Sequence, residues 1–104
     1  DYPLFACVVA QMIQKKEVDR GILICGSGIG MAVAANRFKG VYAGLVWNEE
    51  IARVSRKHDK VNVLVLPSDF ISPQEAVILV NAWLETEFLG GRYQDRIHMI
   101  DDIK

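Results

Sequence analysis

A cysteine followed by a glycine-rich loop is the part of this sequence whose residue types could do chemistry. The segment GILICGSGIG occupies residues 21–30, with a short apolar run that ends at Cys25 and glycines that then alternate with other residues. Glycines leave backbone N–H groups uncovered where the next helix begins, and such groups bind anions. A helix N-terminus also favours the thiolate form of a nearby thiol. The segment therefore predicts a reactive site.

Other titratable and cationic side chains lie later in the chain. His58 stands in a charged run, and a histidine side chain, with an unperturbed pKa of about 6.5, suits a general acid or base near neutrality. On composition alone it could equally be a solvated surface histidine. Arg92 and Arg96 are four residues apart, so one helical face could present both guanidinium groups to a phosphate. By itself, such an arginine pair more often belongs to a solvated helix face. Nothing in the sequence supports a functional role for His98, which we expect to be solvated. Cys7 lies between apolar neighbours in a predicted helix, so we expect it in the core.

Alternating strands and helices must position these residues. Apolar runs predict strands at 22–25, 41–46 and 61–66, and helical periodicity predicts helices at 4–13, 31–38, 49–57, 72–88 and 92–103. Strand–helix alternation means parallel strands with right-handed crossovers. We expect a doubly wound, three-layer α/β/α fold with a parallel sheet (Rossmann-like), with Cys25 at the strand end where such sheets carry their active sites.

Length and composition limit the possible functions. A chain of 104 residues allows one small domain, and the formal net charge of −1 gives no electrostatic reason to bind nucleic acid or an anionic membrane. No apolar run reaches the roughly 20 residues of a membrane span, and no signal peptide is visible, so the sequence reads as cytoplasmic. The two cysteines have neither disulfide-framework nor zinc-site spacing.

Five segments together resemble a known family. They are Asp1-Tyr2-Pro3, the segment 21–30, Ala34-Ala35-Asn36-Arg37, Ser55-Arg56-Lys57-His58, and Ala82-Trp83-Leu84 through Gly90-Gly91-Arg92. In this combination the chain resembles the type B ribose-5-phosphate isomerases, which share their fold with the galactose-6-phosphate isomerase subunits. The resemblance covers essentially all of the chain. It implies aldose–ketose isomerisation of ribose 5-phosphate and ribulose 5-phosphate through an enediolate, with no metal or organic cofactor.

The resemblance also implies roles for individual residues. Cys25 would be the base that moves the proton, Ser27 would assist it, and His58 would help to open the sugar ring. Arg92 and Arg96 would bind the phosphate, and backbone N–H groups of residues 26–30 would stabilise the oxyanion. Further substrate contacts implied in the same way are Tyr2, Gly26, Gly28, Ile29, Gly30 and Asp59.

Three positions depart from the family pattern and leave the substrate open. Asp59 stands where the family usually has Asn, Asp69 closes a Pro-Ser-Asp turn where many members have an Arg, and Tyr93 replaces a frequent His. Both carboxylates would repel a phosphate. The alternatives are a hexose-6-phosphate isomerase acting on galactose or allose 6-phosphate, and a non-catalytic sugar-phosphate-binding subunit. A dinucleotide loop is disfavoured because it needs G-x-G-x-x-G spacing.

We also expect the domain to extend beyond these residues and to act as an oligomer. The predicted order begins with a helix and contains three strands, so an N-terminal β-α-β portion is expected before it, as in the family. The last predicted helix has no following strand to cross to. We therefore expect it to pack on a partner subunit, with the site shared in a homodimer or, as the alternative, a tetramer.

Overall fold

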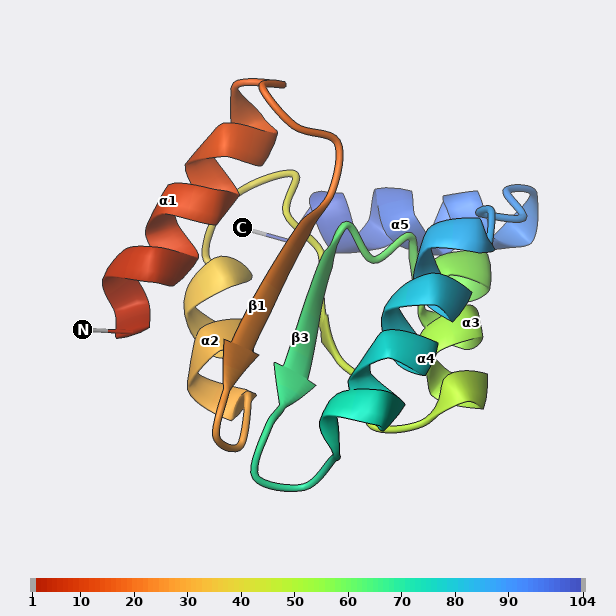
Figure 1. Ribbon diagram of the computed structural model, residues 1–104. Coiled ribbons are helices and arrows are strands. Elements are labelled where there is room, and N and C mark those ends of the chain that lie inside the picture. The colour runs from red at the N-terminus through yellow and green to blue at the C-terminus, as the bar shows by residue number, and fades with distance from the viewer. Residues whose placement is uncertain (1, 104) are drawn as a thin grey trace.

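A three-layer α/β/α sandwich is seen in the computed structural model, which describes residues 2–103 (Figure 1). The parallel sheet has the order β1-β3-β2, with β1 at Gly21–Cys25, β2 at Ala43–Leu45 and β3 at Val63–Pro67. The five helices are α1 (Tyr2–Gln14), α2 (Ile29–Ala35), α3 (Glu49–Asp59), α4 (Pro73–Glu85) and α5 (Arg92–Asp101). The predicted fold class and the predicted order of elements are confirmed.

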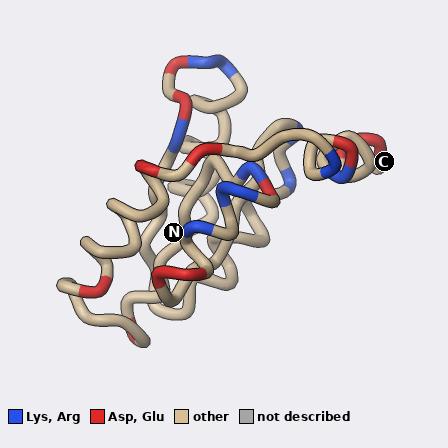
Figure 2. The backbone as a smooth tube through the Cα atoms, turned by 90° about the vertical axis from the view of Figure 1, so that its right-hand side faces the viewer, with Lys and Arg blue, Asp and Glu red and all other residues tan. Residues whose placement is uncertain are grey.

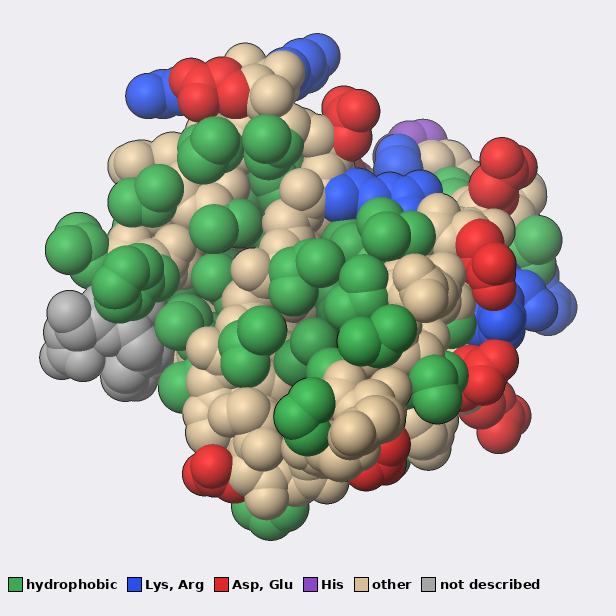
Figure 3. Space-filling view, viewed as in Figure 1, with side chains coloured by type: hydrophobic (Ala, Val, Ile, Leu, Met, Phe, Trp, Pro, Cys, Tyr) green, Lys and Arg blue, Asp and Glu red, His purple; other side chains and the backbone are tan. Residues whose placement is uncertain are grey.

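The central strand β3 is buried on both faces, which explains its uninterrupted apolar sequence. Val63 and Val65 point into a core formed with α1 and α2, whereas Leu64 and Leu66 point into a second core formed with α3 and α4. In the edge strand β1, Ile22 and Ile24 face the second side, where they remain 41% and 60% exposed. This part of the sheet is left uncovered by the described helices, and Figure 3 shows hydrophobic side chains at the surface around β1 and α4.

Local side-chain bonds set the ends of two helices. Helix α4 begins with a capping box: the backbone N–H of Glu75 donates to Ser72 Oγ, and the Glu75 carboxylate accepts from the N–H of Ser72. The helix ends at Glu85, three residues before the predicted end. Thr86 there adopts an extended backbone, and its hydroxyl donates to the carbonyl of Ala82.

Helix α2 and strand β2 are both shorter than predicted. The helix begins two residues early, at Ile29, and ends at Ala35 because the Asn36 side chain bonds to both backbone groups of Ala43. These bonds, at 2.9 and 2.7 Å, turn the chain toward the sheet. The strand is limited to Ala43–Leu45.

The last helix lies beside the amino-terminal ends of the strands (Figure 1). Its Ile97 is buried, and the Tyr42 hydroxyl, just before β2, donates to the Asp101 carboxylate at 2.5 Å. The N–H of Leu89 donates to the carbonyl of Lys57, which holds the preceding loop to the end of α3. Helix α5 is therefore at the opposite end of the sheet from Cys25.

Candidate active site

Cys25 is the last residue of β1 and lies next to Pro67, the last residue of β3. Its carbonyl accepts a 2.9 Å hydrogen bond from the N–H of Ser68, so both strand ends are held together. The side chain is half-buried and packs against the core formed with α1 and α2. A thiol is thus fixed at the carboxyl edge of the sheet, as the sequence predicts.

The glycine loop turns the chain directly from Cys25 into α2. Gly28 has φ +79°, a conformation that favours glycine, and a Cβ there would lie 2.5 Å from Leu45 Cδ1, so a side chain would also displace Leu45. The exposed Ser27 accepts a hydrogen bond on Oγ from the N–H of Ile29 at 3.3 Å. The first N–H groups of a helix, here including that of Gly30, have no intrahelical acceptor. They face the same end of the sheet as Cys25.

Asp69 lies against this loop. Its N–H donates to the carbonyl of Gly26 at 3.0 Å, and one carboxylate oxygen is 2.6 Å from the point that a Cβ on Gly26 would occupy. The segments that follow the three strands, 26–30, 46–50 and 67–74, contain no Lys or Arg. Figure 2 accordingly shows only acidic charge at the lower end of the tube. The end of the sheet that carries the thiol is therefore acidic.

A second group of predicted residues gathers where α3 meets α5. The His58 imidazole stacks on the Tyr93 ring, with centroids 4.3 Å apart and planes within 9°. The guanidinium carbons of Arg92 and Arg96 lie 5.0 and 5.5 Å from the centroid of the Tyr93 ring. Both arginines are exposed, as is Asp59 at the end of α3. This group can bind an anion and supply an imidazole.

The two groups lie at opposite ends of the sheet. Helix α3 starts after β2 and returns to the start of β3, so His58 precedes a strand whereas Cys25 ends one. A five-residue strand such as β3 spans roughly 15 Å. The protomer therefore brings Cys25, Ser27 and the glycines together, and separately His58 and the arginines. The Tyr2 side chain lies outside the described part of the chain, so its predicted contact stays a prediction.

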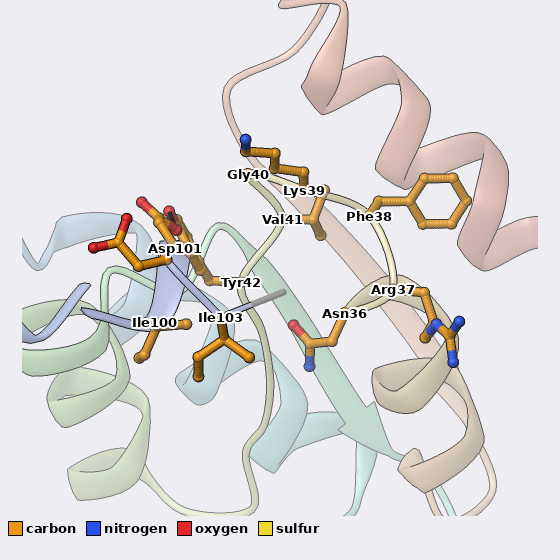
Figure 4. Close-up of a pocket in the computed structure, with 11 residues that line it drawn as sticks. Asn36, Arg37, Phe38, Lys39, Gly40, Val41, Tyr42, Ile100, Asp101 and Ile103 are labelled. Atoms are coloured by element: carbon orange, nitrogen blue, oxygen red, sulfur yellow. Dashed lines mark hydrogen bonds between the residues drawn. The ribbon is translucent and has the colours of Figure 1, made fainter. Parts of the chain in front are cut away.

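Two cavities lie near these groups but contain none of the predicted residues. One of about 650 Å³ lies between the α2–β2 connection and the end of α5 (Figure 4). Tyr42 lines it, and burial together with the hydrogen bond to Asp101 raises the Tyr42 pKa to about 12. The other, of about 310 Å³, is apolar and lies beside Ile24 and Leu66. Ile24 and Leu66 alternate along their strands with Cys25 and Val65, so this apolar cavity opens on the face of the sheet opposite to the Cys25 side chain.

Two further findings concern the whole described region. Across residues 2–103, no three His, Cys, Asp or Glu side chains come together in a way that could hold a metal ion. No helix in that range has the length and apolar character needed to cross a membrane.

Comparison with known proteins identifies the family. Residues 1–100 match the sequence profile of the Ribose/Galactose Isomerase family. The chain belongs to this family. The sequence is 41% identical over 104 residues to ribose-5-phosphate isomerase B of Escherichia coli, and the match covers 100% of this chain and 70% of that protein.

Solved structures of relatives have the same fold. A ribose 5-phosphate isomerase of Thermotoga maritima matches with a TM-score of 0.97 and 45% identity, over 99% of this chain and 71% of that one. Ribose-5-phosphate isomerase B of Mycoplasma genitalium, solved with bound ribulose-5-phosphate, matches with a TM-score of 0.94 and 47% identity. That match covers 97% of this chain and 67% of the other. The chain thus spans about two thirds of the length of these relatives.

The sequence does not predict two side-chain contacts of the site. The sequence shows that Asp69 departs from the family pattern, but it does not predict the contact of the Asp69 side chain with the loop next to Cys25. The stacking of Tyr93 on His58 was also missed, although the spacing of Tyr93 and Arg96 at i, i+3 places these two on one helical face. Both contacts join segments that are distant in the chain.

Proposed function

We propose that this protein is an aldose–ketose isomerase that interconverts ribose 5-phosphate and ribulose 5-phosphate. The observation that carries the proposal is the match, at 47% identity and a TM-score of 0.94, to a ribose-5-phosphate isomerase B with bound ribulose-5-phosphate. The position of Cys25 beside the glycine loop supports it, because isomerisation needs a base next to oxyanion donors.

In the proposed reaction the Cys25 thiolate removes the proton from C2 of the open-chain aldose. The electron pair moves to the C1 carbonyl, and the enediolate oxygen accepts hydrogen bonds from loop N–H groups such as that of Gly30. The thiol then returns the proton to C1, which leaves the carbonyl at C2. Ser27 is exposed beside this thiol, so its hydroxyl is available to assist the transfer between oxygens.

The phosphate and the ring oxygen are assigned to residues of a second protomer. A five-carbon sugar phosphate is shorter than the separation between Cys25 and the arginines along β3. The loops at the thiol end carry only acidic charge, whereas a phosphate requires cations. We therefore infer a homodimer in which Arg92 and Arg96 of one copy bind the phosphate beside Cys25 of the other. His58 of that same copy would open the ring.

Exposed apolar side chains support such a partner surface. Beside the glycine loop, Ile29 and Val33 of α2 are 59% and 63% exposed, and α5 exposes Met99 and Ile100. A two-fold dimer is self-complementary, so contact of α5 with the thiol end would occur twice and complete two sites. Phosphorylated sugars and two free thiols also fit a reducing cytoplasm, which is where we place this reaction.

One observation favours a second candidate, a hexose-6-phosphate isomerase. The Asp69 carboxylate at Gly26 can accept hydrogen bonds from sugar hydroxyls and repels a phosphate brought near it. A six-carbon substrate has one more hydroxyl to offer this carboxylate and holds its phosphate one carbon further from C1.

A coupled isomerase assay tests both candidates. The chain, together with any residues that adjoin it in its native protein, is assayed with ribose 5-phosphate, allose 6-phosphate and galactose 6-phosphate. We expect the highest kcat/KM with ribose 5-phosphate. A higher value with a hexose phosphate would favour the second candidate. Binding of these sugar phosphates without any turnover would instead identify a non-catalytic binding subunit.

A further inference from the structure

Tyr93 lies at the centre of the cluster that joins α3 to α5. Its ring stacks on His58 at a centroid distance of 4.3 Å, and the two guanidinium groups of Arg92 and Arg96 lie within 5.5 Å of the same centroid. One aromatic side chain thus contacts all three groups to which the proposed function assigns ring opening and phosphate binding.

The contacts with Tyr93 hold the arginines without neutralising them. In the described part of the chain, the ion pairs are those of Arg53 with Glu49 and Glu85, so neither Arg92 nor Arg96 has a carboxylate partner there. An aromatic face attracts a guanidinium through its quadrupole and leaves the N–H donors free for a ligand. Arg92 also donates to Tyr93 Oη at 3.0 Å, a bond that raises the pKa of Arg92.

The backbone brings this ring to His58. Gly91, with φ +56°, precedes α5 and places Tyr93 in the first turn of the helix. The hydrogen bond from the N–H of Leu89 to the carbonyl of Lys57 ties the preceding loop to the end of α3. The stack therefore joins two elements whose relative position decides where the imidazole and the guanidinium groups point.

From this geometry we propose that Tyr93 is a positioning residue, which holds His58, Arg92 and Arg96 in the orientation that receives the sugar phosphate. The inference rests on the proposed function for the identity of the ligand. Stacking of two rings and cation–π contacts both depend on the aromatic face rather than on the phenol oxygen. The ring, more than the hydroxyl, should therefore be required.

Three variants separate the ring from the hydroxyl and from general stability. Tyr93→Phe keeps the aromatic face, and Tyr93→Leu keeps apolar bulk without it. Tyr42→Phe is the control, since it removes a phenol that bonds Asp101 at the other end of the same helix. We expect Tyr93→Leu to lower kcat/KM with ribose 5-phosphate about tenfold through displaced reactive groups. Tyr93→Phe and Tyr42→Phe should stay within about twofold of the wild type.

Two further measurements test the role of Tyr93 without depending on enzymatic turnover. The ring current of Tyr93 should shift the His58 ring-proton resonances upfield in the wild type, in Tyr93→Phe and in Tyr42→Phe, and this shift should vanish in Tyr93→Leu. Titration with inorganic phosphate should show several-fold weaker binding to Tyr93→Leu alone. Failure to isomerise any sugar phosphate would overturn the proposed function but not these two results. Unchanged His58 resonances or unchanged phosphate affinity in Tyr93→Leu would overturn the role of Tyr93, as would a kcat/KM within twofold of that of an active wild type.

Discussion

At the scale of single residues, the chain contains its own control for the role of the thiol. Cys25 ends β1 beside the glycine loop, whereas Cys7 lies within α1, and both side chains are half-buried. We expect Cys25→Ala to lower kcat with ribose 5-phosphate at least about a hundredfold, because the variant lacks the base. Cys7→Ala should keep nearly full activity. Both variants should show native circular dichroism, and an active Cys25→Ala enzyme would remove the thiol from the mechanism.

A second residue-scale prediction concerns the carboxylate beside the loop. Asp69→Asn removes a negative charge next to Gly26 while it keeps the size of the side chain. Steady-state kinetics should show a KM for ribose 5-phosphate that is lower by about two- to fivefold, as expected for an exposed charge. Asp102→Asn, at the far end of α5, is the matched control and should leave KM unchanged. A higher KM in Asp69→Asn would mean that the carboxylate binds the sugar.

At the scale of elements, the capping box of α4 makes stability depend on pH. The Glu75 carboxylate accepts a hydrogen bond from the backbone N–H of Ser72, and this bond lowers the pKa of Glu75 below its usual 4.5. Because the pKa of Glu75 is lower in the folded state than in the unfolded state, the charged carboxylate stabilises the fold at pH values above the unfolded-state pKa. This stabilisation is lost as the pH falls through the folded-state pKa. Glu75→Gln should therefore melt below the wild type at pH 7, with the difference shrinking toward pH 3. A constant difference in melting temperature would contradict this origin.

The elements themselves could be predicted from the sequence, because each depends on local patterns. The apolar run at 61–66 predicts the strand β3, and the helical periodicity from residue 72 predicts the start of α4 to within one residue. The end of α4 could not be predicted, since the extended backbone of Thr86 continues into a loop bonded to α3. The stack of His58 on Tyr93 depends on that same loop. The sequence also contains the information that separates Cys25 from His58. In a parallel sheet, a residue that ends one strand lies at the opposite edge from a residue that precedes another strand.

At the scale of the whole molecule, a shared site predicts complementation between inactive subunits. Cys25→Ala and the double variant Arg92→Ala/Arg96→Ala should each be nearly inactive. Each mixed dimer would hold one site with both defects and one intact site, so random reassociation should restore about a quarter of wild-type activity. Assay of the mixed proteins after subunit exchange checks this expectation. No recovery, with mixed dimers demonstrated by mass spectrometry, would place the whole site within one protomer.

The position of the thiol and the guanidinium groups at opposite ends of β3 has a consequence for kinetic order. A lone protomer would hold the thiol part of one site and the phosphate-binding part of another, so catalysis would require an encounter between two copies. Below the dissociation constant of the dimer, the initial rate should therefore rise with the square of protein concentration, and above it linearly. Dilution alone would switch the enzyme off, without any change in its fold.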